Sequence, residues 1–374
     1  MNIKLLIVVL YMALMIAISV WSTWKIKNQG ASGYLLAGKS VPWLLLATMV
    51  MGLSIGGTAT TGVAQNAYQY GISAGWYGVS VAVAVLAFAA VVMKKAHRYN
   101  FGTAAEIFGR AFDKPEGFLC VLTSVIQHIG LYSLQIISGG AVLYGLLPGV
   151  FSLTSAQIVT AVIFLVISLL GGYLGAVMVN LNNTLLIYIG LFIATFTSLV
   201  SVDGWGNLTM SLQAASPDVP WTNLISGAGI VTILSWMLTQ VINGLANQPH
   251  FQLVASAKNY KNAKIGIVVG AILMLPVGFL CAVVGMVARI RFPELLASGE
   301  TSSAFTMVVG AMHPLVGGLV LAGLWAAVVS TAIALNSGVQ MLGVHVLIKE
   351  FFAPNMKDKT EVMLSRIYVV IVTL

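Results

Sequence analysis

The feature that most constrains this chain is a series of apolar runs, each long enough to cross a bilayer. A membrane-spanning helix needs about 20 consecutive apolar residues. Hydrophobic residues make up 59% of the chain, charged residues 7%, and the mean hydropathy is +0.97. We therefore predict an all-α polytopic membrane protein embedded in a lipid bilayer. The predicted spans are 3–24, 42–66, 72–93, 117–145, 156–175, 177–202, 223–246, 264–289 and 314–348, with a further span from about residue 363.

The basic residues orient these spans. If the N-terminus lies outside, all but three of the 18 lysine and arginine residues fall in, or directly beside, inner segments. Cytoplasmic loops are enriched in lysine and arginine, so we predict this orientation in the cell (cytoplasmic) membrane. The net charge of +8 then reflects orientation, and we expect no nucleic-acid partner and see no obligatory protein partner. The inner segments are 25–41, 94–116, 247–263 and 349–366, and the three outer residues are Lys4, Arg289 and Arg291.

Motifs typical of enzymes do not occur in the sequence. It contains no phosphate-binding loop, no GxSxG elbow and no HExxH helix, and its histidines lack metal-ligand spacing. The acidic residues all map to predicted loops or helix ends. We therefore predict that the chain is not an enzyme.

Neutral polar residues interrupt the span 42–66. The stretch "GLSIGGTATTG" (52–62) lowers helix propensity over several consecutive residues. Peptide groups freed inside a membrane must be buried in protein or line a cavity. Packing of small residues at a helix interface is the alternative interpretation for this stretch and for the two other polar groups. Those groups are Ala327, Ser330 and Thr331, which share one helix face, and Gln240, Asn243 and Asn247.

An unwound helix presents carbonyl oxygens at one end of the break and N–H groups at the other. The carbonyls of Gly52 and Ile55, with the Ala327 carbonyl and the hydroxyls of Ser330 and Thr331, form an all-oxygen set that suits a hard cation. The N–H end suits a polar or anionic small-molecule solute. We therefore predict an ion-coupled transporter. The predicted solute-binding residues are Gly56, Gly57, Thr58, Thr60, Gln127, Gln240 and Asn243.

Three stretches carry a resemblance to a known family. Residues 36–80, which open with "LAGKSVPW", 247–271 and 321–342, which contains "STAIALNS", resemble the solute:sodium symporter family. The resemblance implies a LeuT-type 5+5 inverted repeat with an extra N-terminal helix, which works by alternating access. It also implies a Na⁺ site at Gly52, Ile55, Ala327, Ser330 and Thr331.

The same resemblance divides the single transmembrane domain, residues 1–374, into parts. They are an extra helix (3–24), a first repeat (42–202) and a second repeat (223–374). Because the second repeat is shorter than the first, we expect it to be truncated.

Two departures from the family pattern bear on ions and solutes. Asn180, in "MVNLNN", occupies the position of an aspartate that serves a second sodium in some members, so we predict one Na⁺ per solute. Asn247, Gln248 and Pro249 replace the Asn-Gln-Tyr that is typical of sugar transporters. This departure weakens a sugar assignment. The predicted solute is an amino acid, a short organic acid or a similar small polar molecule, and a neutral solute is equally compatible with the sequence. A passive channel, or a non-transporting membrane sensor on the same fold, remains an alternative.

Overall fold

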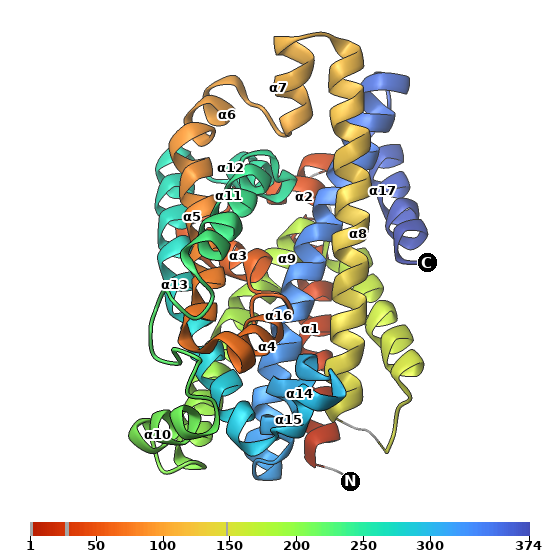
Figure 1. Ribbon diagram of the computed structural model, residues 1–374. Coiled ribbons are helices and arrows are strands. Elements are labelled where there is room, and N and C mark those ends of the chain that lie inside the picture. Colours follow the sequence, from red (N-terminus) through yellow and green to blue (C-terminus); the bar gives the residue numbers. More distant parts are fainter. Residues whose placement is uncertain (1–2, 27–29, 147–148) are drawn as a thin grey trace.

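The computed structural model describes residues 3–26, 30–146 and 149–374, and these residues form a helical bundle (Figure 1). The predicted inner residue Lys27 lies outside the described residues. The longer helices are α1 (Ile3–Ile26), α3 (Trp43–Ser54), α4 (Thr61–Tyr70), α5 (Trp76–Val91), α8 (Lys114–Leu146), α9 (Leu153–Val200), α11 (Ile230–Ala246), α12 (Gln248–Ser256), α13 (Tyr260–Arg291), α16 (Pro314–Gln340) and α17 (Asp358–Thr373). Shorter elements are α2 (Gly30–Leu36), η1 (Ala37–Lys39), η2 (Gly71–Gly75), α6 (Met93–Tyr99), α7 (Ala104–Ala111), α10 (Trp205–Ala215), α14 (Glu294–Ser298), η3 (Thr301–Ser303), α15 (Ala304–Gly310) and the π-helix η4 (Met341–Glu350).

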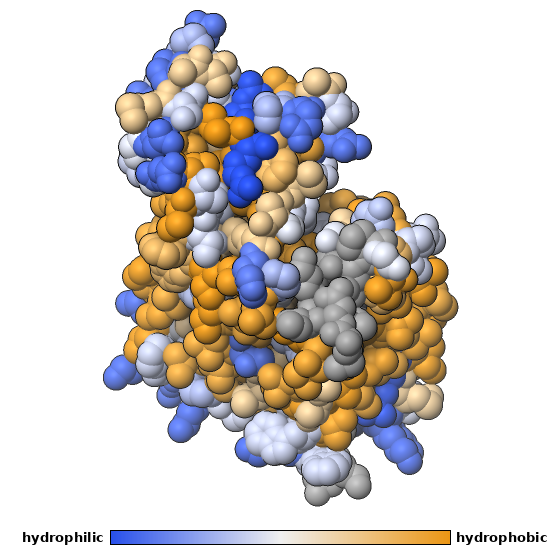
Figure 2. Space-filling view, turned by 90° about the horizontal axis from the view of Figure 1, so that it is seen from below, coloured by the Kyte–Doolittle hydropathy of each residue, from blue (hydrophilic) through white to orange (hydrophobic). Residues whose placement is uncertain are grey.

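The long helices have the length and hydropathy of membrane spans. Among the described residues, five qualify, or six if α11 and α12 form one bent span. On the face shown in Figure 2, much of the surface between the polar clusters is hydrophobic. Helices α6 and α7 lie at one end of the bundle, whereas α10, α14 and α15 lie at the other end with the N-terminus (Figure 1). The basic residues of α6, α7 and the start of α8 therefore gather at one end, as the charge pattern predicts.

Helix α9 contains two antiparallel halves. Gly172 interrupts it with φ 52° and ψ −158°, a conformation that favours glycine. The ring of Trp325 lies 6.3 Å from that of Phe164 before the break and 5.7 Å from that of Tyr11, whose hydroxyl donates to Asn183 after the break. The chain therefore reverses at Gly172, slightly earlier than the predicted gap between residues 175 and 177. The turn needs a single residue with positive φ, and the asparagines further along continue the helix.

The predicted span 42–66 is broken, and it extends to residue 70. Helix α3 ends at Ser54 and α4 begins at Thr61, and residues 55–60 between them are not helical. After α4 the chain turns at Gly71, where an added Cβ would lie 2.4 Å from the carbonyl oxygen of Trp221. The next helix, α5, then packs against α11 and α13.

A second broken helix was not predicted. Helices α11 and α12 meet at Asn247 with a bend of 50°. Pro249 lies in the first turn of α12, a position where the missing N–H of proline is tolerated. Helix α11 also begins at Ile230, later than the predicted residue 223. Gly229, at φ 80°, precedes it, and the side chain of Asn223 accepts backbone hydrogen bonds from the preceding turn.

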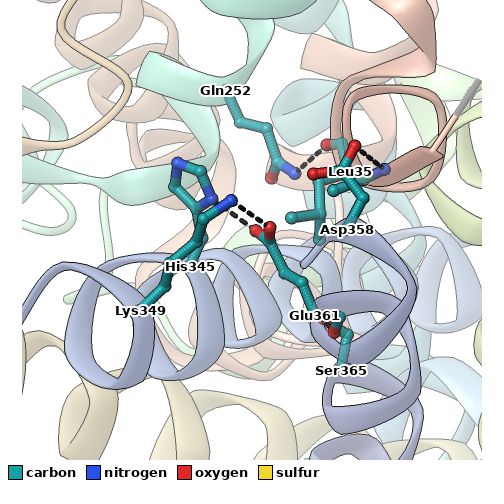
Figure 3. A network of polar contacts seen from close by, with 8 residues as sticks. Leu35, Gln252, His345, Lys349, Asp358, Glu361 and Ser365 are labelled. Carbon is teal, nitrogen blue, oxygen red and sulfur yellow. Dashed lines mark hydrogen bonds and ion pairs between the residues drawn. The ribbon is translucent and has the colours of Figure 1, made fainter. Parts of the chain in front are cut away.

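Helix α16 forms the centre of the bundle. It packs against α1, α3, α8 and α9, and its side chains from Val320 to Gln340 are all buried. It continues directly into η4, which α17 holds in place. Nδ1 of His345 and Nζ of Lys349, both in η4, each lie 2.5 Å from a carboxylate oxygen of the buried Glu361 (Figure 3).

Candidate functional site

Four of the five predicted sodium-binding residues meet between α3 and α16. The Thr331 hydroxyl lies 2.8 Å from the carbonyl oxygen of Gly52 and 3.2 Å from that of Ala327. The Ser330 hydroxyl lies 2.8 Å from the same Ala327 oxygen. The two carbonyl and two hydroxyl oxygens are neutral and lie in a buried setting. Such oxygens are the ligands that a hard cation prefers.

Ile55, the fifth predicted residue, ends α3 beside this cluster. It is buried and non-helical, with φ −98° and ψ 77°, and its N–H donates to the Met51 carbonyl. Within the described part of the chain, no hydrogen bond joins Ile55 to α16. The structure therefore places Ile55 at the break and links the other four residues directly.

Asn180 borders the same cluster. A Cβ added to Gly52 would lie 2.3 Å from Asn180 Oδ1 and 3.0 Å from Ser330 Cβ, so only glycine leaves room here. The Asn180 amide donates to the Met49 sulfur at 2.8 Å, and Oδ1 is buried without a hydrogen-bond partner. The residue therefore contributes a neutral oxygen beside Gly52.

The broken segment satisfies many of its own polar groups. The Thr60 hydroxyl donates to the Gly56 carbonyl at 3.0 Å, and the Thr61 hydroxyl donates to the Gly57 carbonyl at 2.9 Å. The two glycines also allow close packing of α8. A Cβ on Gly56 would lie 2.9 Å from Gln135 Oε1, and one on Gly57 would lie 2.8 Å from the Ser138 hydroxyl. Glycine is therefore favoured at both positions by the close approach of α8.

A cavity of about 150 Å³ lies next to the broken segment. Gly56, Thr58, Gln240 and Asn243, all predicted as solute-binding residues, line it together with Thr331. Because Thr331 also contacts Gly52, the cavity adjoins the oxygen cluster directly. Further polar lining residues that the sequence did not single out for solute are Ser54, Tyr77, Gln135, Asn247 and His250.

The remaining three predicted solute-binding residues do not line the cavity. Gly57 and Thr60 are buried in the break and do not line the cavity. Gln127 donates from Nε2 to Asn243 Oδ1 at 3.0 Å, so it contacts a lining residue without lining the cavity itself. Of these three residues, Gln127 is joined to the cavity lining by its hydrogen bond with Asn243.

The cavity wall combines polar and apolar side chains, and among the described residues that line it there is no acidic residue, lysine or arginine. Gln240 Nε2 donates to the Tyr77 hydroxyl at 2.9 Å, which orients both side chains. Gln135 Oε1 is buried and accepts no hydrogen bond. An unsatisfied buried acceptor is costly, so a bound molecule that donates a hydrogen bond there would be favoured.

A sequence signal existed for some of the missed residues. Gln135 lies in the middle of the predicted span 117–145, as Gln127 does, and polar residues inside a span usually face the bundle interior. Tyr77 had no such signal, because a tyrosine near the end of a span is equally typical of the membrane interface.

Comparisons with known proteins identify the family of the chain. The chain matches the sodium:solute symporter family over residues 34–374. It is 22% identical to sodium/glucose cotransporter 4 of Danio rerio, over 78% of this chain and 47% of the relative, and 23% identical to the sodium/glucose cotransporter of Vibrio parahaemolyticus, over 97% and 72%. The chain thus spans about half the length of the first of these relatives.

A solved structure shares the fold. A Na⁺-coupled sialic acid symporter in a substrate-bound outward-open state superposes with a TM-score of 0.85 at 16% identity, covering 99% of this chain and 80% of that one. The predicted LeuT-type helical fold is therefore confirmed. With the family matched over residues 34–374, the chain belongs to the sodium:solute symporter family.

Proposed function

We propose that the protein carries out sodium-coupled symport of a small polar solute by alternating access, with one Na⁺ per solute. The observation that carries this proposal is the direct contact between two sites. Thr331 contributes to the oxygen cluster through its contact with Gly52, and it also lines the solute cavity. One side chain therefore faces both the ion and the solute.

The residues proposed to hold Na⁺ are Gly52, Ile55, Ala327, Ser330 and Thr331. When bound, Na⁺ supplies a positive charge that attracts oxygen atoms of α3 and α16 to one point. Helix α3 ends at the break, and α16 is the buried central helix. The association of these two helices therefore bears directly on whether the cavity is open. Movement of one charge through the membrane potential is worth about 2.3 kcal/mol per 100 mV, which suffices for tens-fold accumulation of solute.

We further propose that the solute is uncharged and rich in hydroxyl groups, like a sugar or polyol. The wall offers amide and hydroxyl groups and no lysine or arginine for a carboxylate. The unpartnered Gln135 oxygen calls for a hydrogen-bond donor, which a hydroxyl supplies and a carboxylate does not. The glucose named for two relatives belongs to this class.

An amino acid or short organic acid is the second candidate. Thr58 and Ala59 line the cavity just before the first turn of α4, and the start of a helix carries a partial positive charge that favours an anion. The carboxylate of such a solute would have to bind to backbone N–H groups alone.

The proposed orientation places the N-terminus outside and the basic end, with α6 and α7, in the cytoplasm. The protein would then reside in the cytoplasmic membrane.

Counterflow of labelled solutes in proteoliposomes tests the function. The panel contains sugars, polyols, amino acids and short organic acids, each measured with Na⁺ and with K⁺ in its place. We expect Na⁺-dependent exchange of one neutral polyhydroxylated solute. Conductance or flux that ignores Na⁺ would instead identify a passive channel.

A further inference from the structure

A second polar cavity, of about 210 Å³, lies at the basic end of the bundle, separate from the solute cavity. Its rim carries the exposed side chains of Lys39, His97 and Lys258, and its floor contains the buried residues Phe101, Val254 and Ala257. We refer to it as the basic pocket. Within the described parts of the chain, no acidic residue lines it.

The positive charge of the basic pocket is not neutralised by the protein. In the described parts of the chain, ion pairs are formed by His345 and Lys349 with Glu361, and by no residue of this pocket. Two lysines that share a concave site without a carboxylate raise the local potential and attract an anion.

Three separate segments bring the basic side chains together. Lys39 ends η1, His97 lies in α6, and Lys258 lies between α12 and α13. A short parallel bridge fixes the first and third segments: the Val41 N–H donates to the Ser256 carbonyl at 3.1 Å, and the Lys258 N–H donates to the Val41 carbonyl at 3.0 Å. These bonds fix the backbone of Lys258 beside Val41, two residues after Lys39.

The surroundings add further affinity for an anion. The His97 ring packs on Tyr260 at 5.3 Å, which holds it at the rim. Tyr260 is the first residue of α13, a helix of 32 residues that begins beside the pocket, and Asn259 caps it by accepting from the Asn262 N–H. The start of a long helix carries partial positive charge, which adds to that of the lysines.

We propose that the basic pocket binds a phosphoryl group, carried either by an anionic phospholipid headgroup or by a free phosphate compound. A phosphoryl group has several acceptor oxygens that two lysines and a histidine can contact at once. Basic pockets between helices at the cytoplasmic side of membrane proteins are typical sites for such headgroups.

The test measures binding to the purified full-length chain by native mass spectrometry and by thermal unfolding. One arm titrates phosphatidylglycerol against phosphatidylcholine, and the other titrates inorganic phosphate against chloride at equal ionic strength. Phosphatidylglycerol retention alone identifies a lipid site, and stabilisation by inorganic phosphate identifies a site for a soluble phosphate compound. Either result supports the proposal, and the absence of both overturns it.

Matched variants distinguish a site from general surface charge. Lys39→Gln with Lys258→Gln removes two charges from the pocket, whereas Lys357→Gln with Lys359→Gln removes two exposed charges outside it. We expect binding about 25-fold weaker in the pocket variant, from roughly fivefold per lysine, and little change in the control. Equal losses in both variants, or none in the pocket variant, would show that no specific site exists. All these lysines lie outside the proposed Na⁺ and solute sites, so the outcome is independent of transport.

Discussion

The hydroxyl of Thr331 lies 2.8 Å from the carbonyl oxygen of Gly52, which is 279 positions away in the sequence. This contact joins the central helix α16 to the last turn of α3, directly before the break. Since Thr331 also lines the solute cavity, a change at this residue should affect ion and solute together.

The first prediction concerns the hydroxyls of the oxygen cluster. Replacing Ser330 and Thr331 together by alanine removes two of the proposed Na⁺ ligands. We expect the Na⁺ concentration for half-maximal uptake to rise at least about tenfold, since one lost contact to a charged group is worth about 1.5–3 kcal/mol. Ser235→Ala is the control, because the Ser235 hydroxyl is exposed and bonds only to the Val231 carbonyl. An unchanged Na⁺ dependence would remove these residues from the site.

The second prediction concerns space at the broken segment. Gly56→Ala places a Cβ 2.9 Å from Gln135 Oε1 and 3.0 Å from the Thr331 hydroxyl, so the neighbours must shift. We expect loss of most solute uptake while the protein still folds. Gly130→Ala is the matched control, since no atom lies within 4 Å of a Cβ there. Uptake that is equal in the two variants would show that α8 does not need to approach the break.

The third prediction concerns the unpartnered acceptor in the cavity. Gln135→Met keeps the size of the side chain and removes its oxygen. If a solute hydroxyl donates to this oxygen, the KM for uptake should rise by roughly five- to tenfold, which corresponds to about 1 kcal/mol for a neutral hydrogen bond. Gln213→Met, on the peripheral helix α10, serves as control. A lower KM in Gln135→Met would indicate that the buried oxygen opposes solute binding.

The fourth prediction concerns the reversal in α9. Gly172 has φ 52°, and a Cβ there would also lie 2.9 Å from the Tyr34 carbonyl oxygen. Gly172→Ala should therefore lower the free energy of unfolding by about 1–3 kcal/mol, as expected for a strained non-glycine residue. Thermal unfolding in detergent measures this, with Gly206→Ala, which meets no atom within 4 Å, as reference. Equal midpoints would contradict the proposed strain.

The fifth prediction concerns the buried carboxylate of Glu361. Burial raises its pKa, but the hydrogen bonds and charges of His345 and Lys349 outweigh this effect, so the pKa lies below its usual value. A lowered folded-state pKa stabilises the fold above the ordinary pKa of about 4.3. This contribution is lost as the pH falls through the folded-state value.

Glu361→Gln should accordingly be less stable than the natural chain at pH 7 and should lose less stability between pH 7 and pH 4. Melting temperatures across this range measure the effect. Glu294→Gln, at the start of α14, is a control outside the network. A variant with the same pH profile as the natural chain would show that the network has no energetic role.

Local composition and helical spacing predicted several residues of the candidate site. The Gly and Thr cluster at 52–62 lowers helix propensity wherever it lies, and Ser330 and Thr331 share a face with Ala327 by helical spacing alone. The end of the span at residue 246 was predicted, but helix α12 was missed although Pro249 marks a helix start, because residues 247–263 were assigned to an inner loop. Sequence periodicity does not report which helices become neighbours. Gln135 and Tyr77 reach the cavity only because α8 and α5 pack around the break.

The hydrogen bonds of Val41 with Ser256 and Lys258 have a mechanical consequence. They fasten the base of α3 to the end of α12, the helical segments that precede the first break and follow the second. A displacement of either segment must carry the other along or rupture two backbone bonds. Access to the cavity from the basic end is therefore expected to change through the concerted motion of this pair, and a tether between positions 41 and 257 should leave such motion intact.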